Sequence, residues 1–537
     1  MSDVLLGQSY YLRFDKKLWK AMQPYPPLGT LYAAAHLRRC GYEVAVFDAM
    51  LSQSTEKWDE ALVADLPTFA VLFEDNFNYL SKMCLRRMRT AALDMITSAR
   101  RHGCTVAVCG SDAADHPEAY LDGGAHFVLI GEGEETLAEL VDYLSGRSSG
   151  ALSEVRGLAY RGAHGSLVRT PPRPVATQLD ALSLPAWDLI DVSRYRDIWM
   201  REHGYFSLNL VTSRGCPFHC NWCAKPIWGQ RYNARSPEDV VDEMAYLKAR
   251  FAPDHFWFMD DMMGVKPGWM NHFAELVAAR GLRTPFKSLN RVDMLLRDGE
   301  IEALRRAGCE IVWTGVESGS QKILDAMDKG IRVEQVREAA SRLHAAGIEV
   351  GFFLQFGFPG ETRTDIELTV DLVRACLPDQ IGISVSYPLP GTPFHEMVRE
   401  QLGAKRNWEH SDDLAMMYRG PFATGFYRRL HAALHKEFRM RLAGRRLRTM
   451  LGIRAKRQMA ASENRSAAKR TAERLFREAA ALLYHGATLP LARLRMERAA
   501  HRPHEGIEPL RGRLAPEQAA APSSQEAIPP PMHAAQP

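Results

Sequence analysis

The sequence has 537 residues, 46% of them hydrophobic, which is enough for large buried cores and too long for one ordinary domain. Its 68 lysines and arginines nearly balance its 64 acidic residues, so the net charge of +4 gives no reason to expect nucleic acid across the surface. No apolar run reaches the roughly 18 residues of a membrane span, and the start, MSDVLLGQSYYLRFDKK, lacks the pattern of a signal peptide. We therefore expect a protein of the reducing cytoplasm.

Residues 1–146 alternate short apolar strands with helices. The expected strands are residues 4–7, 43–49, 69–75, 105–110 and 127–131, and the expected helices are residues 28–39, 79–101 and 134–144. Short apolar strands separated by helices indicate a parallel sheet covered on both faces. The sequence thus predicts a doubly wound, Rossmann-like domain, with its ligand crevice at the carboxyl ends of the strands.

Residues 147–195 are rich in Gly, Ser, Pro and Arg, which is typical of a linker with room for one hairpin. Residues 205–392 then repeat a strand–helix unit six times. Six consecutive units predict a partial (β/α)6 barrel within a second domain, residues 196–395. Active residues of such barrels lie at the carboxyl ends of the strands and in the loops just after them.

From residue 396 the alternation stops, and we expect a helical extension, residues 396–513, followed by a disordered tail, residues 514–537, rich in Pro, Ala and Gln. The arginine-rich helices could contact anionic lipid or an acidic partner. A solvated helical face is the plainer interpretation and is favoured. Residues 407–427 could form a substrate cap or simply a packing extension.

Three of the nine cysteines, Cys216, Cys220 and Cys223, lie within eight residues, directly after the first barrel strand. Thiolates suit iron–sulfur clusters or zinc. Three ligands would leave one iron of a cluster open, and no further Cys or His at standard spacing supports a structural zinc site. His219 lies inside the loop and is a poor fourth ligand. The remaining cysteines are scattered through apolar contexts and are expected to be structural: Cys40, Cys84, Cys104, Cys109, Cys309 and Cys376.

The pattern Cys-x3-Cys-x-aromatic-Cys, with Trp222 as the aromatic residue, resembles the signature of the radical S-adenosylmethionine (radical SAM) family. The resemblance covers about residues 205–395. It implies a [4Fe–4S] cluster on the three cysteines, whose open iron is chelated by the amino and carboxylate groups of S-adenosylmethionine. It also implies reductive cleavage of that cofactor to a 5′-deoxyadenosyl radical.

Polar residues end the later barrel strands, where the family places groups around the cofactor: Asp260, Asp261, Asn290, Arg291, Glu317, Ser318 and Gln355. A carboxylate such as Asp260 or Asp261 can accept hydrogen bonds from an ammonium group. Arg291 could pair with the cofactor carboxylate, and the resemblance places Glu317 near the ribose and the backbone of residues 387–392 near the adenine. Each residue alone could instead be a helix cap, a solvated charge or a turn residue.

The first domain resembles the cobalamin-binding domains that precede radical modules. Small residues at its strand ends and before its first helix carry this resemblance and would let the backbone approach a flat ring: Gly29, Gly110, Ser111, Gly131 and Gly133. Many cobalamin domains ligate cobalt through an Asp-x-His-x-x-Gly motif, which is absent here, and His116 has the wrong neighbours. The lower axial ligand of cobalt is therefore left open.

The order of domains resembles the group that contains anaerobic magnesium-protoporphyrin ester cyclases and cobalamin-dependent C-methyltransferases. The leading hypothesis is a radical SAM methyltransferase that uses cobalamin to methylate an unactivated carbon of a small molecule or lipid-like substrate. The alternatives are a radical oxidative cyclase and, from another class, a non-catalytic cobalamin sensor. An electron donor such as flavodoxin or ferredoxin is implied. The sequence does not define the substrate, the redox partner or the oligomeric state.

Overall fold

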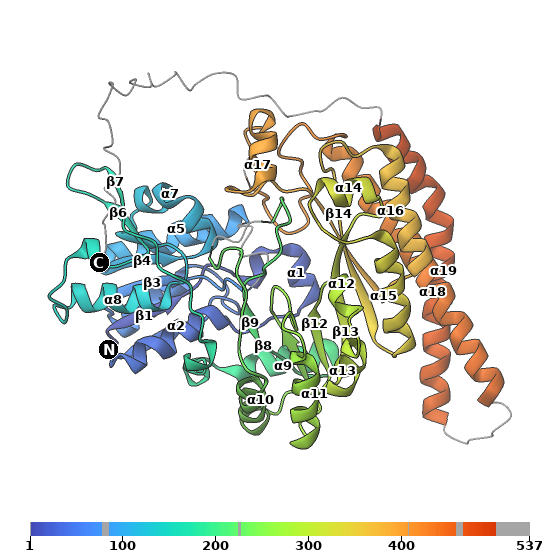
Figure 1. Cartoon of the computed structure of the whole chain (residues 1–537), viewed down its shortest axis with the longest axis horizontal. Helices are drawn as coiled ribbons and strands as arrows, with labels where there is room; N and C mark the ends of the chain where they lie inside the picture. Colours follow the sequence, from blue (N-terminus) through green and yellow to red (C-terminus); the bar gives the residue numbers. More distant parts are fainter. Residues whose placement is uncertain (1, 78–84, 224–226, 406, 458–464, 501–537) are drawn as a thin grey trace, which may run out of the picture.

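The computed structural model describes residues 2–77, 85–223, 227–405, 407–457 and 465–500. Its first sheet has seven strands in the order β2-β1-β3-β4-β5-β6-β7 (Figure 1). The strands are β1 (Val4–Gly7), β2 (Val44–Phe47), β3 (Phe69–Phe73), β4 (Thr105–Cys109), β5 (Phe127–Leu129), β6 (Leu158–Arg161) and β7 (Leu167–Arg169). β1 to β5 pair in parallel, whereas β6 and β7 are antiparallel.

Helices cover both faces of this sheet. They are α1 (Lys16–Ala21), α2 (Leu28–Arg39), α3 (Glu56–Asp65), α5 (Arg86–Arg101), α6 (Ser111–Asp115), α7 (Pro117–Asp122) and α8 (Glu134–Leu144). α2 packs beside α8, and α3 packs beside α5. The continuous apolar stretch of β3 is fully buried between these helices, as expected of a central parallel strand. The predicted doubly wound domain is confirmed.

The sheet extends beyond the boundary expected at residue 146. The segment expected to be a linker forms the β6–β7 hairpin, and β6 pairs with β5 through Leu158 and Leu129. This hairpin covers what would otherwise be an exposed edge of β5. The expected helix from residue 79 starts at Arg86 in the described structure, and residues 78–84, including Cys84, lie outside the described residues.

The second sheet has six strands, all parallel, in the order β15-β14-β13-β12-β11-β8. They are β8 (Ser207–Leu210), β11 (His255–Phe258), β12 (Phe286–Leu289), β13 (Cys309–Glu317), β14 (Glu349–Phe356) and β15 (Gln380–Val385). Two short strands, β9 (Ser213–Arg214) and β10 (Asn233–Ala234), pair beside β8. The six predicted units and the partial barrel are confirmed.

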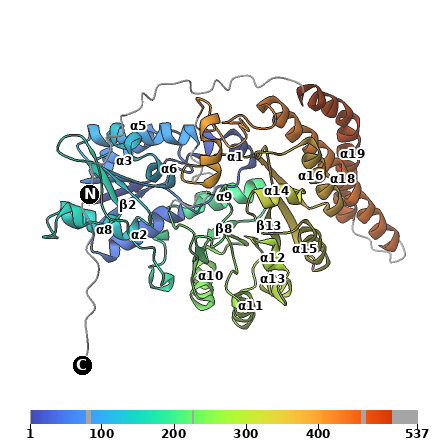
Figure 2. The same ribbon diagram turned by 45° about the horizontal axis from the view of Figure 1, so that its top comes forward.

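The helices that follow the barrel strands are α10 (Pro237–Phe251), α11 (Trp269–Ala279), α12 (Val292–Leu295), α13 (Glu300–Ala307), α14 (Gln321–Ala326), α15 (Val333–Ala345), α16 (Arg363–Cys376) and α17 (Pro393–Val398), and α9 (Val192–His203) precedes β8. Two long helices, α18 (Thr424–Arg457) and α19 (Arg465–Ala500), then pack side by side against the barrel, on the side away from the first sheet (Figures 1 and 2). Among the described residues, no helix has an apolar stretch long enough to cross a bilayer. The expected tail, residues 514–537, lies outside the described residues.

Candidate functional site

The three clustered cysteines lie on the loop between β9 and β10, directly after the first barrel strand. Gly215, immediately before Cys216, has a φ of 80°, and a side chain there would collide with the carbonyl of Arg231. Only glycine suits both constraints, so the loop turns sharply into its first cysteine. Cys216, Cys220 and Cys223 are half-buried and lie at the carboxyl end of the barrel.

The loop is held in place by Asn221, which lies between the second and third cysteines. Its backbone N–H donates to the carbonyl of Met327 at 3.0 Å, and its side-chain amide donates to the carbonyl of Ala326 at 2.6 Å. The carbonyl of Asn221 accepts from the N–H of Phe394 at 3.0 Å. The ends of α14 and α17 therefore fix the loop, while residues 224–226 lie outside the described residues.

Arg291 places a positive charge beside the second cysteine. Its Nη1 lies 4.0 Å from Cys220 Sγ, and its guanidinium carbon lies 3.9 Å from the ring centroid of Phe218. Asp293 holds the guanidinium at 2.7 Å, and the carbonyl of Lys329 accepts a further hydrogen bond. Arg291 was expected to bind a cofactor carboxylate. In the structure its guanidinium group is oriented toward the cysteine loop, with Nη1 pointing at Cys220.

Lys329 adds a second buried cation. Its Nζ donates to Glu317 at 2.8 Å and lies 5.9 Å from the ring centroid of Trp222. Burial lowers the pKa of Lys329, but the charge of Glu317 outweighs burial and raises that pKa above its usual value, so the amine stays protonated. Glu317 itself has a φ of 61° at an irregularity in the pairing of β13 with β14.

A cluster bound to three thiolates carries negative charge, which nearby buried cations stabilise. The donor set of Cys216, Cys220 and Cys223, with Arg291 and Lys329 beside it, therefore fits such a group. Among the described residues, no three Cys, His, Asp or Glu side chains converge closely enough to enclose a metal ion.

Asp260, which follows β11, is a buried carboxylate close to this loop. Its Oδ1 accepts from the backbone N–H of Thr212 at 2.9 Å, the Thr212 hydroxyl at 2.7 Å and the Ser213 hydroxyl at 2.5 Å. Burial raises the pKa of Asp260 to about 6. Its Oδ2 is buried with no hydrogen-bond partner among the described residues, which leaves one oxygen for the ammonium group of a ligand. Asp261, next to it, is half-buried.

Three other residues predicted for the site have partners within the protein. Asn290 accepts from the hydroxyl of Ser288 and donates to the carbonyl of Met263. Ser318 contacts Thr369 at 3.2 Å on the helix side of β13. Gln355 donates to Ser386 at 3.0 Å across β14 and β15. The structure thus brings Arg291 and Glu317 to the cysteine loop, and Asp260 lies after β11 close to the same loop. Asn290, Ser318 and Gln355, in contrast, form hydrogen bonds within the barrel.

Packing, hydrogen bonds and backbone conformation within the protein explain why small residues occupy these positions of the first domain. Side chains at Gly110 and Gly133 would collide with Glu74 and with Cys109, respectively. Gly29 donates its N–H to Asp75 at 3.3 Å. Gly131 has a φ of 85°, and Ser111 donates to Asn76 at 3.2 Å. These residues shape the carboxyl edge of the sheet, and their role toward a corrin ring stays a prediction.

Several buried polar atoms at this edge lack partners among the described residues: Gln8 Nε2, Tyr10 Oη, Tyr25 Oη and Glu74 Oε2. Gln8 and Tyr10 follow β1, and the rings of Tyr10 and Tyr25 stack 6.4 Å apart. Burial raises the pKa of Glu74 to about 7, so its carboxyl group can also donate. Because buried polar groups are normally satisfied, these atoms fit a ligand with many amide groups, such as cobalamin.

An ion-pair network joins the two domains directly beside the cysteine loop. Arg214 of β9 is buried and contacts Glu132 at 3.2 Å and Glu134 at 2.7 Å. Burial lowers the pKa of Arg214, but the two glutamates outweigh it and raise that pKa above its usual value. Asn209 of β8 also donates to the carbonyl of Pro26 at 2.9 Å. The carboxyl edge of the first sheet is therefore fixed against the barrel.

A cavity of about 390 Å³ lies between the first domain and the segment after β15. Asp115 and His116 line one side, and Tyr387, Leu389 and Met417 line the other. Burial raises the pKa of Asp115 to about 7 and lowers the pKa of His116, so both groups can be neutral near pH 7. Its size suits a small organic molecule rather than a whole corrin cofactor.

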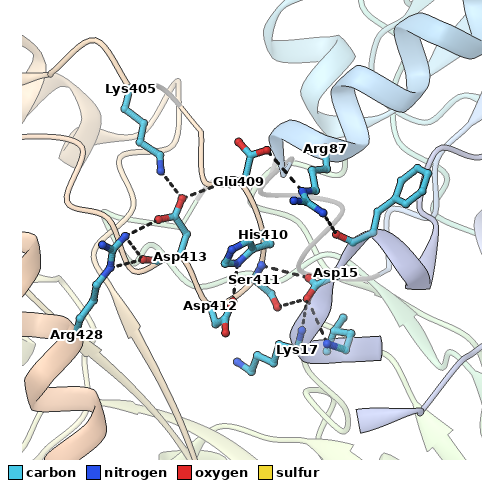
Figure 3. Close-up of polar contacts among 12 residues, drawn as sticks. Asp15, Lys17, Arg87, Lys405, Glu409, His410, Ser411, Asp412, Asp413 and Arg428 are labelled. Carbon is cyan, nitrogen blue, oxygen red and sulfur yellow. Dashed lines mark hydrogen bonds and ion pairs between the residues drawn. The ribbon is translucent and has the colours of Figure 1, made fainter. Parts of the chain in front are cut away.

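The segment expected to be a cap crosses from the barrel to the first domain (Figure 3). Ser411 donates to Asp15 of the α1 N-terminus at 2.8 Å, and Glu409 pairs with Arg87 of α5 at 3.5 Å. On the other side, Asp413 pairs with Lys405 and with Arg428 of α18. The segment therefore closes over one side of the cavity and ties α18 to both domains.

The other described cysteines lie apart from the loop. Burial raises the pKa of the thiols of Cys40, Cys104 and Cys109, and raises it to about 12 at Cys309 and about 11 at Cys376. A thiol that stays protonated is a poor metal ligand. Serine at any of these positions is therefore expected to leave the iron content unchanged, as measured by iron assay after anaerobic reconstitution. Loss of iron in any single variant would reveal a missed ligand.

A six-stranded partial barrel whose first strand leads into a three-cysteine loop is the arrangement expected of a radical SAM domain. Residues 210–373 match the model of the radical SAM superfamily, and they form a radical SAM domain. Among curated proteins, the chain is 30% identical over 285 residues to an uncharacterized methyltransferase of Pyrococcus horikoshii, a match that covers 52% of this chain and 60% of that protein. It is 26% identical to cytidylyl-2-hydroxyethylphosphonate methyltransferase of Streptomyces wedmorensis, over 70% of this chain and 77% of that enzyme.

The anaerobic magnesium-protoporphyrin IX monomethyl ester cyclase of Rubrivivax gelatinosus is 29% identical, over 52% of this chain and 49% of that enzyme. Among solved structures, the radical S-adenosylmethionine methyltransferase TsrM from Kitasatospora setae, with cobalamin and a [4Fe–4S] cluster bound, aligns with a TM-score of 0.61 at 21% identity over 74% of this chain and 75% of TsrM. The cobalamin-dependent radical enzyme OxsB, with aqua-cobalamin bound, aligns with a TM-score of 0.66 at 18% identity over 90% of this chain and 72% of OxsB. Over the aligned residues the chain shares the fold of these enzymes.

Lys329, Arg214 and Tyr10 were not predicted for the site. Arg214 lies two residues before Cys216 and Glu132 directly follows Gly131, so their positions in the sequence could have suggested both residues. Lys329 follows a short helix after β13, and no spacing links it to the cysteines. Only the fold shows that it is close.

Proposed function

We propose that this protein is a radical SAM enzyme that uses a [4Fe–4S] cluster and cobalamin to methylate an unactivated carbon of a small molecule or lipid-like substrate. One observation supports it most: the carboxyl edge of the doubly wound sheet faces the barrel beside the cysteine loop, with unpartnered buried polar atoms along that edge. TsrM and OxsB combine the same fold with cobalamin. The same proposal places the protein in the cytoplasm and gives it a flavodoxin- or ferredoxin-like electron donor.

The protein's own residues have distinct tasks in this scheme. Cys216, Cys220 and Cys223 would hold the cluster, and Arg291 and Lys329 would balance its charge. When bound, the cluster supplies an electron to S-adenosylmethionine, and cobalamin carries the methyl group. Asp260 would accept a hydrogen bond from the cofactor ammonium group. The cavity beside His116 would hold the substrate, with water excluded by the cap segment.

A radical oxidative cyclase is the second candidate, because the Rubrivivax gelatinosus relative is a cyclase. A cobalamin sensor is the third. The test is anaerobic incubation of the reconstituted, reduced protein with methyl-labelled S-adenosylmethionine and a fractionated small-molecule and lipid extract. Label in an extract compound supports methyl transfer. Formation of 5′-deoxyadenosine without labelled product supports the cyclase, and absence of 5′-deoxyadenosine supports the sensor.

Asp260 gives a prediction with opposite effects on stability and binding. In the folded protein the pKa of Asp260 is about 6, above the ordinary value of 3.8, so the native state binds this proton more tightly than the unfolded state does. The free energy of unfolding therefore falls as the pH rises from about 4 to about 6, because the carboxyl group must then be charged while buried. Asp260→Asn should therefore raise the free energy of unfolding at pH 8 by up to about 2 kcal/mol, with little change at pH 4. It should also weaken S-adenosylmethionine binding.

Urea unfolding at both pH values and equilibrium dialysis measure these two effects. The exposed Asp188→Asn serves as the control and should change neither. A variant destabilised at pH 8, or one with unchanged cofactor affinity, would contradict the role of Asp260.

A further inference from the structure

The outermost helix, α19, has two different apolar faces. Its inner face packs on α18, with Leu489, Met496 and Ala499 buried. Polar contacts fix the same face, because Lys436 donates to Thr488 at 2.9 Å and Arg493 pairs with Glu437 at 2.6 Å. The orientation of α19 about its own axis is therefore set by the protein itself.

The outer face carries a second, unpartnered apolar stripe. Phe476 is 75% exposed, Leu483 73% and Leu494 47%, and each follows the previous one by seven or eleven residues, which are two or three helical turns. Leu491 lies along the same side and is also exposed, and so is Tyr484, whose ring also contacts Lys436 of α18. The stripe is about 27 Å long at the helical rise of 1.5 Å per residue. Single exposed apolar residues are common, but an aligned series of large ones marks an interaction surface.

Positive charge lies along the same helix as this stripe. Arg477, Arg495 and Arg498 are exposed along α19, and none of them forms an ion pair with the residues that the structure describes. The two helices together contain 19 lysines and arginines against four acidic residues. Because the whole chain carries only +4, the rest of the protein is net negative. The basic charge is thus concentrated at the end of the molecule that presents the stripe (Figures 1 and 2).

From this combination we infer that the outer face of α19 docks on an anionic lipid surface. A helix with a row of large apolar side chains flanked by arginine lies in the bilayer interface, with the apolar row among the acyl chains and the guanidinium groups at the lipid phosphates. A second copy of the same face is a poor occupant, because two strongly basic helix pairs would repel each other. Docking here does not depend on which reaction the barrel catalyses.

The test is cosedimentation of the full chain with vesicles, either phosphatidylcholine alone or phosphatidylcholine mixed with phosphatidylglycerol. The protein should bind the anionic vesicles, and binding should fall as salt is raised. Phe476→Glu/Leu483→Glu should weaken binding by at least about tenfold, and Arg477→Gln/Arg495→Gln/Arg498→Gln should weaken it and flatten the salt dependence. Because all of these side chains are exposed, the fold should be preserved, which circular dichroism can verify.

The matched control is Val63→Glu/Met200→Glu, which adds the same charge at exposed apolar positions on α3 and α9 and should bind like the unaltered chain. Equal binding by Phe476→Glu/Leu483→Glu would overturn the inference, as would failure of the unaltered protein to bind anionic vesicles. A dimer in light scattering that this variant converts to a monomer would show instead that a second copy covers the face.

Discussion

Replacing Cys216, Cys220 and Cys223 together by alanine is expected to abolish both cluster iron and 5′-deoxyadenosine formation. The unaltered chain should take up about four irons on anaerobic reconstitution. The variant offers no other converging thiols near the loop, because the remaining described cysteines lie apart and stay protonated. Iron and sulfide assays, the visible absorption of the cluster and chromatography of the nucleoside measure the effect.

The cysteine-to-serine variants at the scattered positions are the controls and should retain both iron and activity. Since Gly215 and Asn221 fix the loop independently of the thiols, the triple variant should stay folded. Retention of about four irons by that variant would contradict the assignment of the ligands.

Arg214→Ala is expected to cause the largest loss of stability among the substitutions considered. It leaves Glu132 and Glu134 buried without their cation, and removing one member of a buried ion pair costs about 3–5 kcal/mol. Because the network joins the first sheet to the barrel, the first unfolding transition in urea should move to lower denaturant, with cobalamin affinity falling at the same time.

Arg201→Ala, which breaks a pair with Glu202 that is mostly exposed, is the control and should change stability by less than about 1 kcal/mol. The variant Arg214→Met/Glu132→Gln/Glu134→Gln should recover much of the loss, because no uncompensated charge stays buried. An unfolding transition of Arg214→Ala equal to that of the unaltered chain would show that the network does not hold the domains together.

The sequence predicted the elements whose signal is local. The continuous apolar run Phe69–Phe73 indicates a strand buried on both faces, and the helical period of α10 indicates a helix buried on one face. Both patterns can be read directly from neighbouring residues in the sequence. The cysteine loop was equally clear, because its three ligands are close in sequence. The β6–β7 hairpin was less clear, since strands of only four and three residues carry little periodicity.

The surroundings of the loop could not be predicted, because they come from distant segments. Lys329 reaches Trp222 and Glu317 only through the path of β13 and α14, and a lone lysine in a sequence normally indicates a solvated side chain. The packing around the glycines was equally hidden. A Cβ atom at Gly110 or Gly133 would collide with Glu74 or Cys109, a constraint that only the fold reveals, and the role of these glycines toward a ligand stays a prediction.

We propose that the barrel and the doubly wound domain together transfer methyl groups through cobalamin. The most direct test needs no substrate: the reconstituted chain, loaded with cobalamin and reduced without oxygen, is given methyl-labelled S-adenosylmethionine, and the protein-bound corrin is then separated and counted. We predict label that co-elutes with the cobalamin, together with S-adenosylhomocysteine. Cobalamin that stays bound but unlabelled, while 5′-deoxyadenosine accumulates, would contradict methyl transfer and favour the cyclase.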